Sequence, residues 1–177
     1  QDNNQIELPD NTPLLLAANH ISGIDPFLLI TATRRPIRFM IAVEEYNNPW
    51  LNWMFRAAGC IPVNRSGRVE KAFRSALRAI KAGELVAVFP QGGIHRHDLK
   101  RETIKPGIIR LSQLSGCGVL PVRIEGVGAP GEVAKSVITR SHIKLISHPL
   151  VSAEDVVLPE FRSGMAEWLL GRKESIF

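Results

Sequence analysis

Residues 13–26 read PLLLAANHISGIDP and combine the clearest structural pattern of the chain with its clearest chemical pattern. The apolar run 13–18 has the length and composition of a strand that is buried on both faces. Asp25 followed by Pro26 is typical of a helix start, with the aspartate as the N-cap and the proline in the first helical position. A buried strand that leads through a short turn into a helix predicts an α/β fold.

The rest of the chain repeats this alternation. Further apolar runs rich in Val, Ile, Leu and Ala occur at residues 37–43, 60–63, 85–89, 119–124 and 143–146. Each has the pattern of a strand buried on both faces. The clearest helix spans 69–82, where apolar residues recur at helical spacing and Gly83 supplies the stop. We therefore expect one α/β domain over residues 1–177, with a mostly parallel or mixed central sheet flanked by helices.

The charge balance favours anionic partners. Lys and Arg number 22 against 17 Asp and Glu, which gives a net charge of +5. Nucleic acid is not expected as a partner, because the basic residues are dispersed and no nucleic-acid-binding motif is present. The helix 69–82 carries a basic stripe made of Lys71, Arg74, Arg78 and Lys81. This stripe is interpreted either as a solvated face or as a contact with an anionic membrane surface.

Membrane spanning and disulfide bonding are not expected of this chain. No apolar run approaches the roughly 20 residues that cross a bilayer. The sequence begins at Gln1 with neither an initiator Met nor a signal pattern, which we interpret as a trimmed chain or a missing N-terminal segment, such as an anchor. Cys60 and Cys117 lie far apart without metal-site or disulfide spacing, which predicts two packed thiols in a reducing compartment.

His20 and Asp25 form the first candidate site. At the carboxyl end of the strand 13–18, His20 would reach the sheet edge where open α/β folds bind their ligands. Asp25 would accept a hydrogen bond from one imidazole nitrogen and leave the other as a base. On the spacing alone, an alternative is equally open, in which Asp25 only caps the helix beside an unrelated histidine.

Three later stretches combine a strand with residues suited to anion binding or to a structural break. Arg65 ends a strand, where its guanidinium group would suit either solvent or a phosphate. The strand 85–89 runs into Pro90, Gln91 and a Gly-Gly pair, a turn whose amides can approach an anion. Pro121 lies inside a strand and predicts an edge, a bulge or an interrupted ladder.

Taken in order, these stretches resemble the glycerolipid acyltransferase family, the lysophosphatidic acid acyltransferases and their bacterial relatives, over residues 19–124. The family's first block, NHxSxxD, is matched by Asn19, His20, Ser22 and Asp25. The second, GxIxxxR, is matched by Gly59, Ile61 and Arg65, and the fourth, an apolar-Pro-Val strand, by Leu120, Pro121 and Val122.

The third block departs from the family pattern. The family usually has Phe-Pro-Glu-Gly followed by Thr-Arg-Ser, and Phe89, Pro90 and Gly92 match it. Gln91 replaces the glutamate, which keeps a hydrogen-bonding carbonyl but removes the charge. The usual Thr and Arg positions hold Gly93 and Ile94, so a basic contact from this loop would have to come from Arg96 or Arg101.

The resemblance implies a glycerol-3-phosphate acyltransferase-like fold and acyl transfer from acyl-CoA or acyl carrier protein to lysophosphatidic acid, giving phosphatidic acid without a cofactor. His20 would be the general base and Asp25 its partner. The implied substrate-binding residues are Asn19, Ser22, Arg65, Gln91, Gly92 and Arg96. The protein would work at the cytoplasmic side of a membrane, held peripherally or by a segment outside this chain. Alternatives are another lysolipid or hydroxyl acceptor, or a non-catalytic lipid-binding or acyl-CoA-binding relative.

Two aromatic clusters and one histidine cluster remain. Trp50, Trp53 and Met54 share a helical face, which favours core packing but also suits a membrane interface. A second helical stripe, which we interpret as core, consists of Phe161, Met165, Trp168 and Leu169. His95 and His97 have a spacing that zinc accepts, yet no other ligand cluster completes a site, so no metal is expected.

Overall fold

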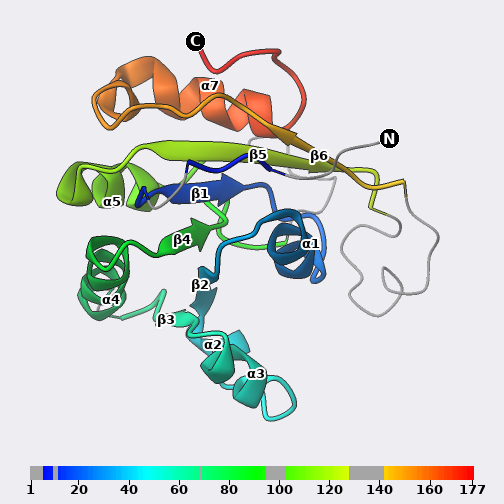
Figure 1. Cartoon of the computed structure of the whole chain (residues 1–177), viewed down its shortest axis with the longest axis vertical. Helices are drawn as coiled ribbons and strands as arrows, with labels where there is room; N and C mark the ends of the chain where they lie inside the picture. Colours follow the sequence, from blue (N-terminus) through cyan, green and yellow to red (C-terminus); the bar gives the residue numbers. More distant parts are fainter. Residues whose placement is uncertain (1–5, 10–11, 68, 95–102, 128–141) are drawn as a thin grey trace.

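A single six-stranded sheet forms the centre of the molecule (Figure 1). This is a computed structural model, and it describes residues 6–9, 12–67, 69–94, 103–127 and 142–177. The strand order is β3-β2-β4-β1-β5-β6. The strands are β1 (Leu15–Ala18), β2 (Ile37–Ala42), β3 (Ile61–Val63), β4 (Leu85–Val88), β5 (Val119–Glu125) and β6 (Lys144–Ser147). All pairings are parallel except that of β6 with β5, so the predicted mixed sheet is confirmed.

Helices cover both faces of this sheet and create two apolar clusters. Side chains alternate along a strand, so Leu15 packs into one cluster and Leu16 into the other. The first cluster joins the sheet to α4 (Glu70–Lys81), α5 (Gly107–Ser115) and α7 (Pro159–Leu169). The second joins it to α1 (Asp25–Ala32). The short helices α2 (Val43–Tyr46) and α3 (Asn52–Ala57) project at the end of the molecule opposite α7 (Figure 1).

The predicted strands and helices form close to their expected positions, but burial differs at the sheet edges. Strands β1 and β5 are largely buried, as expected for central strands. The edge strands β3 and β6 were expected to be buried on both faces, and this prediction is wrong, because β6 has no fully buried residue and Pro62 of β3 is exposed. An edge strand has a neighbour on one side only.

Pro121 lies within β5, where the pairing with the following chain is irregular. Val122 pairs with Ser147, while Val119 forms an isolated bridge with Val151. The segment from Ser147 to Val151 is one residue longer than that from Val119 to Val122, which is a bulge. The carbonyl oxygen of Pro121 accepts a hydrogen bond from the backbone N–H of His148 at 3.0 Å. Of the edge, the bulge and the interrupted ladder that Pro121 left open, the structure shows a bulge, which accommodates a residue that has no N–H to donate.

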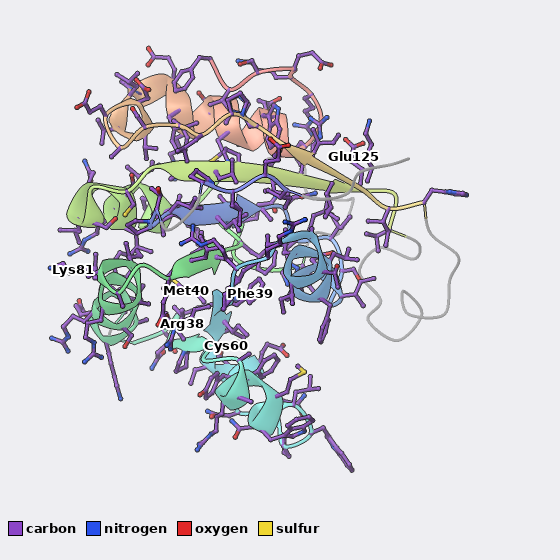
Figure 2. All side chains as sticks on the ribbon, viewed as in Figure 1. Arg38, Phe39, Met40, Cys60, Lys81 and Glu125 are labelled. Carbon is purple, nitrogen blue, oxygen red and sulfur yellow. The ribbon has the colours of Figure 1, made fainter. Side chains whose placement is uncertain are left out.

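The remaining helix predictions are confirmed within the described residues. Helix α4 buries Ala72, Ala76, Ala79 and Ile80 and exposes the basic stripe, and Figure 2 shows Lys81 on the outer side of this helix. The stripe of α7 is buried in the core, and both cysteines are buried free thiols. In the part of the chain that the structure describes, no helix is long and apolar enough to span a bilayer.

The strand order places the ends of β1 and β4 side by side. These two strands are parallel neighbours, so their carboxyl ends lie at the same sheet edge. From β1 the chain continues through α1 to β2, and from β4 it continues through α5 to β5 on the other side of β1. Connections that leave neighbouring strands toward opposite faces open a crevice between them, the usual ligand site of such sheets.

Candidate active site

The turn between β1 and α1 is organised around one carboxylate oxygen. Oδ2 of Asp25 accepts hydrogen bonds from Nδ1 of His20 at 2.9 Å, from the backbone N–H of Ile21 at 2.7 Å and from that of Ser22 at 2.8 Å. The Asp25 side chain has no solvent exposure, whereas that of His20 is 18% exposed. Two backbone donors thus fix the carboxylate that holds the imidazole.

The structure corrects the capping role expected of Asp25. Helix α1 begins with Asp25 itself, the N-cap residue is Ile24, and no side chain caps the helix. The carboxylate turns back to the amides of Ile21 and Ser22, which precede the helix, instead of accepting bonds from helix amides. The proline signal for the helix start was right, but the aspartate organises the turn that carries His20.

The imidazole of His20 is held on its face as well as at Nδ1. Its ring stacks on Phe89 with the ring centroids 4.2 Å apart and an interplanar angle of 18°. Phe89 stacks in turn on Phe39 of β2. Because the Asp25 carboxylate is an acceptor, neutral His20 carries its proton on Nδ1 and keeps the lone pair of Nε2 as a base.

Asn19 and Ser22 are buried and contact the protein itself. The side-chain amide of Asn19 donates to the carbonyl oxygen of Ile124 at 2.9 Å, and its oxygen accepts from the Ile124 N–H at 2.7 Å. Ser22 has no solvent exposure. The sequence placed both residues among those that bind substrate, but the contacts described here tie the turn to β5 and to Asp25.

The turn after β4 reaches the same histidine. Oε1 of Gln91 accepts a hydrogen bond from the backbone N–H of His20 at 3.1 Å. Gly92 adopts a φ of +83°, a conformation that favours glycine, and its N–H donates to the carbonyl oxygen of Phe89. A Cβ on Gly92 would lie 2.5 Å from Nζ of Lys105, so the end of the lysine side chain would have to move to admit a larger residue.

His20 faces a pocket of 680 Å³ between α1, β2, α3 and the turn after β4. Apolar side chains make up most of its wall, among them Phe27, Ile30, Ile41, Leu51, Met54 and Phe55. Within the described ranges, the charged residues that line it are Glu44, Glu45 and Arg65. The volume and the apolar wall suit a ligand with a hydrocarbon chain, placed beside a base.

Of the predicted substrate-binding residues, Arg65 and Gly92 line this pocket. Arg96 lies outside the described residues, as do Arg101 and the two histidines of the zinc hypothesis, His95 and His97. Among the residues that the structure does describe, no group of three His, Cys, Asp or Glu side chains is placed to hold a metal ion.

Comparison with known proteins assigns the family. Residues 1–125 match the family model described as Acyltransferase, which is more than half of the chain. The chain belongs to the acyltransferase family. A 1-acyl-sn-glycerol-3-phosphate acyltransferase of Bacillus subtilis is 24% identical over 158 residues, covering 88% of this chain and 76% of that protein.

Two further similarities concern a solved structure and a plant enzyme. The crystal structure of the 1-acyl-sn-glycerophosphate (LPA) acyltransferase of Thermotoga maritima superposes with a TM-score of 0.68 at 25% identity, covering 94% of this chain and 67% of that one. An N-acylphosphatidylethanolamine synthase of Arabidopsis thaliana is 28% identical over 113 residues, covering 58% of this acyltransferase and 40% of the plant protein.

Cys60 also lines the pocket of this acyltransferase, but its thiol is poorly suited to attack. Burial raises the pKa of Cys60, which outweighs the opposing effects of a backbone hydrogen bond at Phe39 and of the Arg38 charge. Figure 2 labels Cys60 close to Arg38. A raised pKa keeps the thiol protonated at neutral pH, and the thiol is a weak nucleophile.

Several parts of this site were not predicted from the sequence. The pocket wall from α1 uses Phe27 and Ile30, which are 48% and 44% exposed. The short run from Phe27 to Ile30 is apolar on every side, a signal that one face serves something other than the core. Lys105 carried no signal at all, because it lies beyond the motif and meets Gly92 only in the folded chain.

Proposed function

We propose that this acyltransferase moves a fatty acyl group from acyl-CoA or acyl carrier protein to the free hydroxyl of lysophosphatidic acid, giving phosphatidic acid. The observation that carries the proposal is the His20–Asp25 pair at the wall of a largely apolar pocket. The names of the Bacillus and Thermotoga relatives support the choice of acceptor. We further propose that the protein acts at the cytoplasmic side of a membrane.

In the proposed reaction His20 is the general base. The acceptor oxygen attacks the thioester carbonyl carbon while Nε2 takes the hydroxyl proton. The tetrahedral intermediate then collapses, the C–S bond breaks, and the imidazolium returns its proton to the leaving thiolate. The negative charge of Asp25 stabilises the imidazolium and fixes its orientation. Two substrates balance all atoms and electrons, so we propose no cofactor and no acyl-enzyme.

The other residues named above then divide into binding and supporting roles. Arg65 and the Gly92 turn line the pocket and would hold the acceptor phosphate, with Arg96 as a further candidate. Gln91 would set the position of the His20 backbone through its hydrogen bond. Asn19 and Ser22 would support the turn from within.

A direct test measures acyl transfer from labelled acyl-CoA and acyl carrier protein to lysophosphatidic acid. Replacing His20→Ala is expected to lower kcat about 10²- to 10⁴-fold, the usual contribution of a positioned general base. The matched control is His142→Ala, which changes an exposed histidine and should keep wild-type turnover. Circular dichroism confirms that each variant folds. Unchanged turnover in folded His20→Ala protein would refute the proposed base.

A second candidate acceptor carries an amine in its head group. Among the described residues that line the pocket, the carboxylates of Glu44 and Glu45 outnumber the guanidinium of Arg65. Gln91 is also neutral where the family usually has a glutamate. The same assay therefore includes lysophosphatidylethanolamine and a lyso-aminolipid. Faster turnover of these lipids than of lysophosphatidic acid would favour the second acceptor, and donor binding without any transfer would favour a non-catalytic relative.

A further inference from the structure

The segment from α2 to α3 presents large apolar side chains to solvent. Trp50 is 85% exposed, Trp53 is 71% exposed and Leu51 is 40% exposed. The core packing that the sequence favoured for the two tryptophans is therefore wrong. The chain has three tryptophans, and the third, Trp168, is 3% exposed in the core. We call Trp50, Leu51 and Trp53 the aromatic tip.

Local hydrogen bonds hold the aromatic tip in its outward conformation. Nε1 of Trp53 donates to the carbonyl oxygen of Trp50 at 3.1 Å, and the backbone N–H of Trp50 donates to Oδ1 of Asn48 at 3.0 Å. These two N–H groups are thus paired locally, while the tryptophan side chains remain largely exposed. Large apolar side chains that are exposed next to one another are uncommon on monomeric soluble proteins, and they usually indicate a binding surface.

The aromatic tip is continuous with the pocket of His20. Leu51 belongs to both the tip and the pocket wall, and Met54 of α3 extends that wall. Phe27 and Ile30 of α1 are partly exposed and line the same pocket. Apolar side chains therefore lead from the protein surface to the catalytic histidine, along the path that an acyl chain leaving a lipid layer would take.

Positive charge follows the aromatic tip toward α4. Arg56 lies one helical turn after Trp53 and lines a groove of 560 Å³ together with Arg78 of α4. Beyond Arg78, the outer face of α4 carries the rest of the basic stripe, and all four of its side chains are exposed. Apolar rings next to a row of cations form the pattern of a protein surface that lies on an anionic lipid layer.

We propose that the aromatic tip and the basic stripe together form the surface by which this protein binds an anionic phospholipid bilayer. Tryptophan suits the interface because its ring is apolar and its N–H polar. Each cation near such a surface strengthens binding several-fold. A folded protein partner fits less well, because the cations are spread along a whole helix and not gathered around a central anchor. This proposal rests on the proposed function in one respect only, namely that the acyl chain enters the pocket from the lipid layer.

The test is flotation of the whole chain with phosphatidylcholine vesicles that contain either no anionic lipid or one third phosphatidylglycerol. Replacing Trp50→Ser and Trp53→Ser together is expected to lower the partition coefficient at least tenfold on the anionic vesicles. The control is Leu114→Ser, because Leu114 is 54% exposed on α5, away from the tip. It should bind as the unchanged protein does.

The electrostatic part is tested by Arg74→Ser with Arg78→Ser, which should lower the partition coefficient roughly fivefold for each cation removed. Replacing Arg172→Ser with Lys173→Ser removes the same charge from the exposed C-terminal segment and should change binding far less. Binding should fall with added salt. Tryptophan emission should shift to shorter wavelength on the anionic vesicles, since Trp50 and Trp53 leave water while Trp168 is already buried.

Two outcomes would overturn the proposal. One is unchanged flotation of the Trp50→Ser, Trp53→Ser protein, and the other is tight binding to a folded protein through the tip with no affinity for anionic vesicles. Turnover of a short-chain lysophosphatidic acid in free solution separates this result from the proposed function. Retained turnover without vesicle binding would refute the membrane surface and leave the acyl transfer standing, whereas vesicle binding without any turnover would do the reverse.

Discussion

The turn at His20 and the aromatic tip meet at the same pocket, which His20 and Leu51 both line, but their side chains differ in what they contact. Asp25 is fully buried, and its Oδ2 has three donors from the turn around it. The side chain of Trp50, in contrast, is 85% exposed. The folded chain itself thus supplies the three donors of this oxygen, as a preorganised group requires. The side chains of the aromatic tip leave water only when something outside the chain covers them.

The largest expected effect comes from removing the negative charge of Asp25 in the turn at His20. Asp25→Asn keeps the shape of the side chain and one carbonyl oxygen for the amides of Ile21 and Ser22. It removes the negative charge that stabilises the imidazolium, so we expect kcat to fall about 10²- to 10⁴-fold while the protein still folds. Asp155→Asn, at an exposed aspartate of the short 3-10 helix before α7, is the matched control. Comparable kcat values for both variants would contradict the role of Asp25.

A stability comparison tests whether the tip contributes to the fold. Phe161→Ala removes a fully buried ring from the core and should lower the free energy of unfolding by about 3 to 5 kcal/mol. Trp53→Ala removes a larger ring that is mostly exposed, and the change should stay within about 0.5 kcal/mol. Denaturant unfolding monitored by circular dichroism measures both. A large loss for Trp53→Ala would mean that the tip packs against the fold.

A smaller loss of stability than that of Phe161→Ala is expected at the link between the turns of His20 and Gln91. Gln91→Ala removes the acceptor of the His20 backbone N–H, which is partly buried, and should cost about 1 to 3 kcal/mol of stability. Gln91→Glu keeps an acceptor oxygen at the same place and should cost less. Thermal unfolding compares the two variants with the unchanged protein. An equal loss of stability in Gln91→Ala and Gln91→Glu would show that the hydrogen bond to the His20 N–H is not how Gln91 stabilises the protein.

The sequence predicted the elements well because each depends on neighbouring residues. The apolar run before Asn19 has the length of a buried strand and is too short for a typical helix, and the residues of α4 follow a clear helical spacing. The order of the strands and the meeting of Gln91 with His20 depend on contacts 71 residues apart, which no local pattern contains. The prediction that Trp50 and Trp53 are buried failed for another reason. The residue type indicates that a tryptophan side chain tends to be covered, but it does not indicate whether the protein core or a binding partner covers it.

The role of Asp25 shows the same limit within a single motif. Aspartate before proline indicates a helix start, and that much was correct. The direction in which the carboxylate turns is decided by the bend at Ile21 and Ser22, whose amides point to it. His20 and Asp25 were correctly paired because the resemblance to a family added information that spacing alone did not hold.

Asn19 gives this turn a further property. Strand β1 ends at Ala18, yet β5 continues to Glu125, so the backbone of Ile124 would lack its partner. The Asn19 side chain supplies a donor and an acceptor to that residue, as one more peptide group of β1 would. The main chain can therefore leave strand β1 after Ala18 and bend toward His20, while the backbone groups of Ile124 keep their hydrogen bonds. An aspartate side chain has no N–H to donate, and a glutamine side chain is one methylene longer. The asparagine before His20 is therefore explained by its side-chain amide, which takes the place of a backbone peptide group.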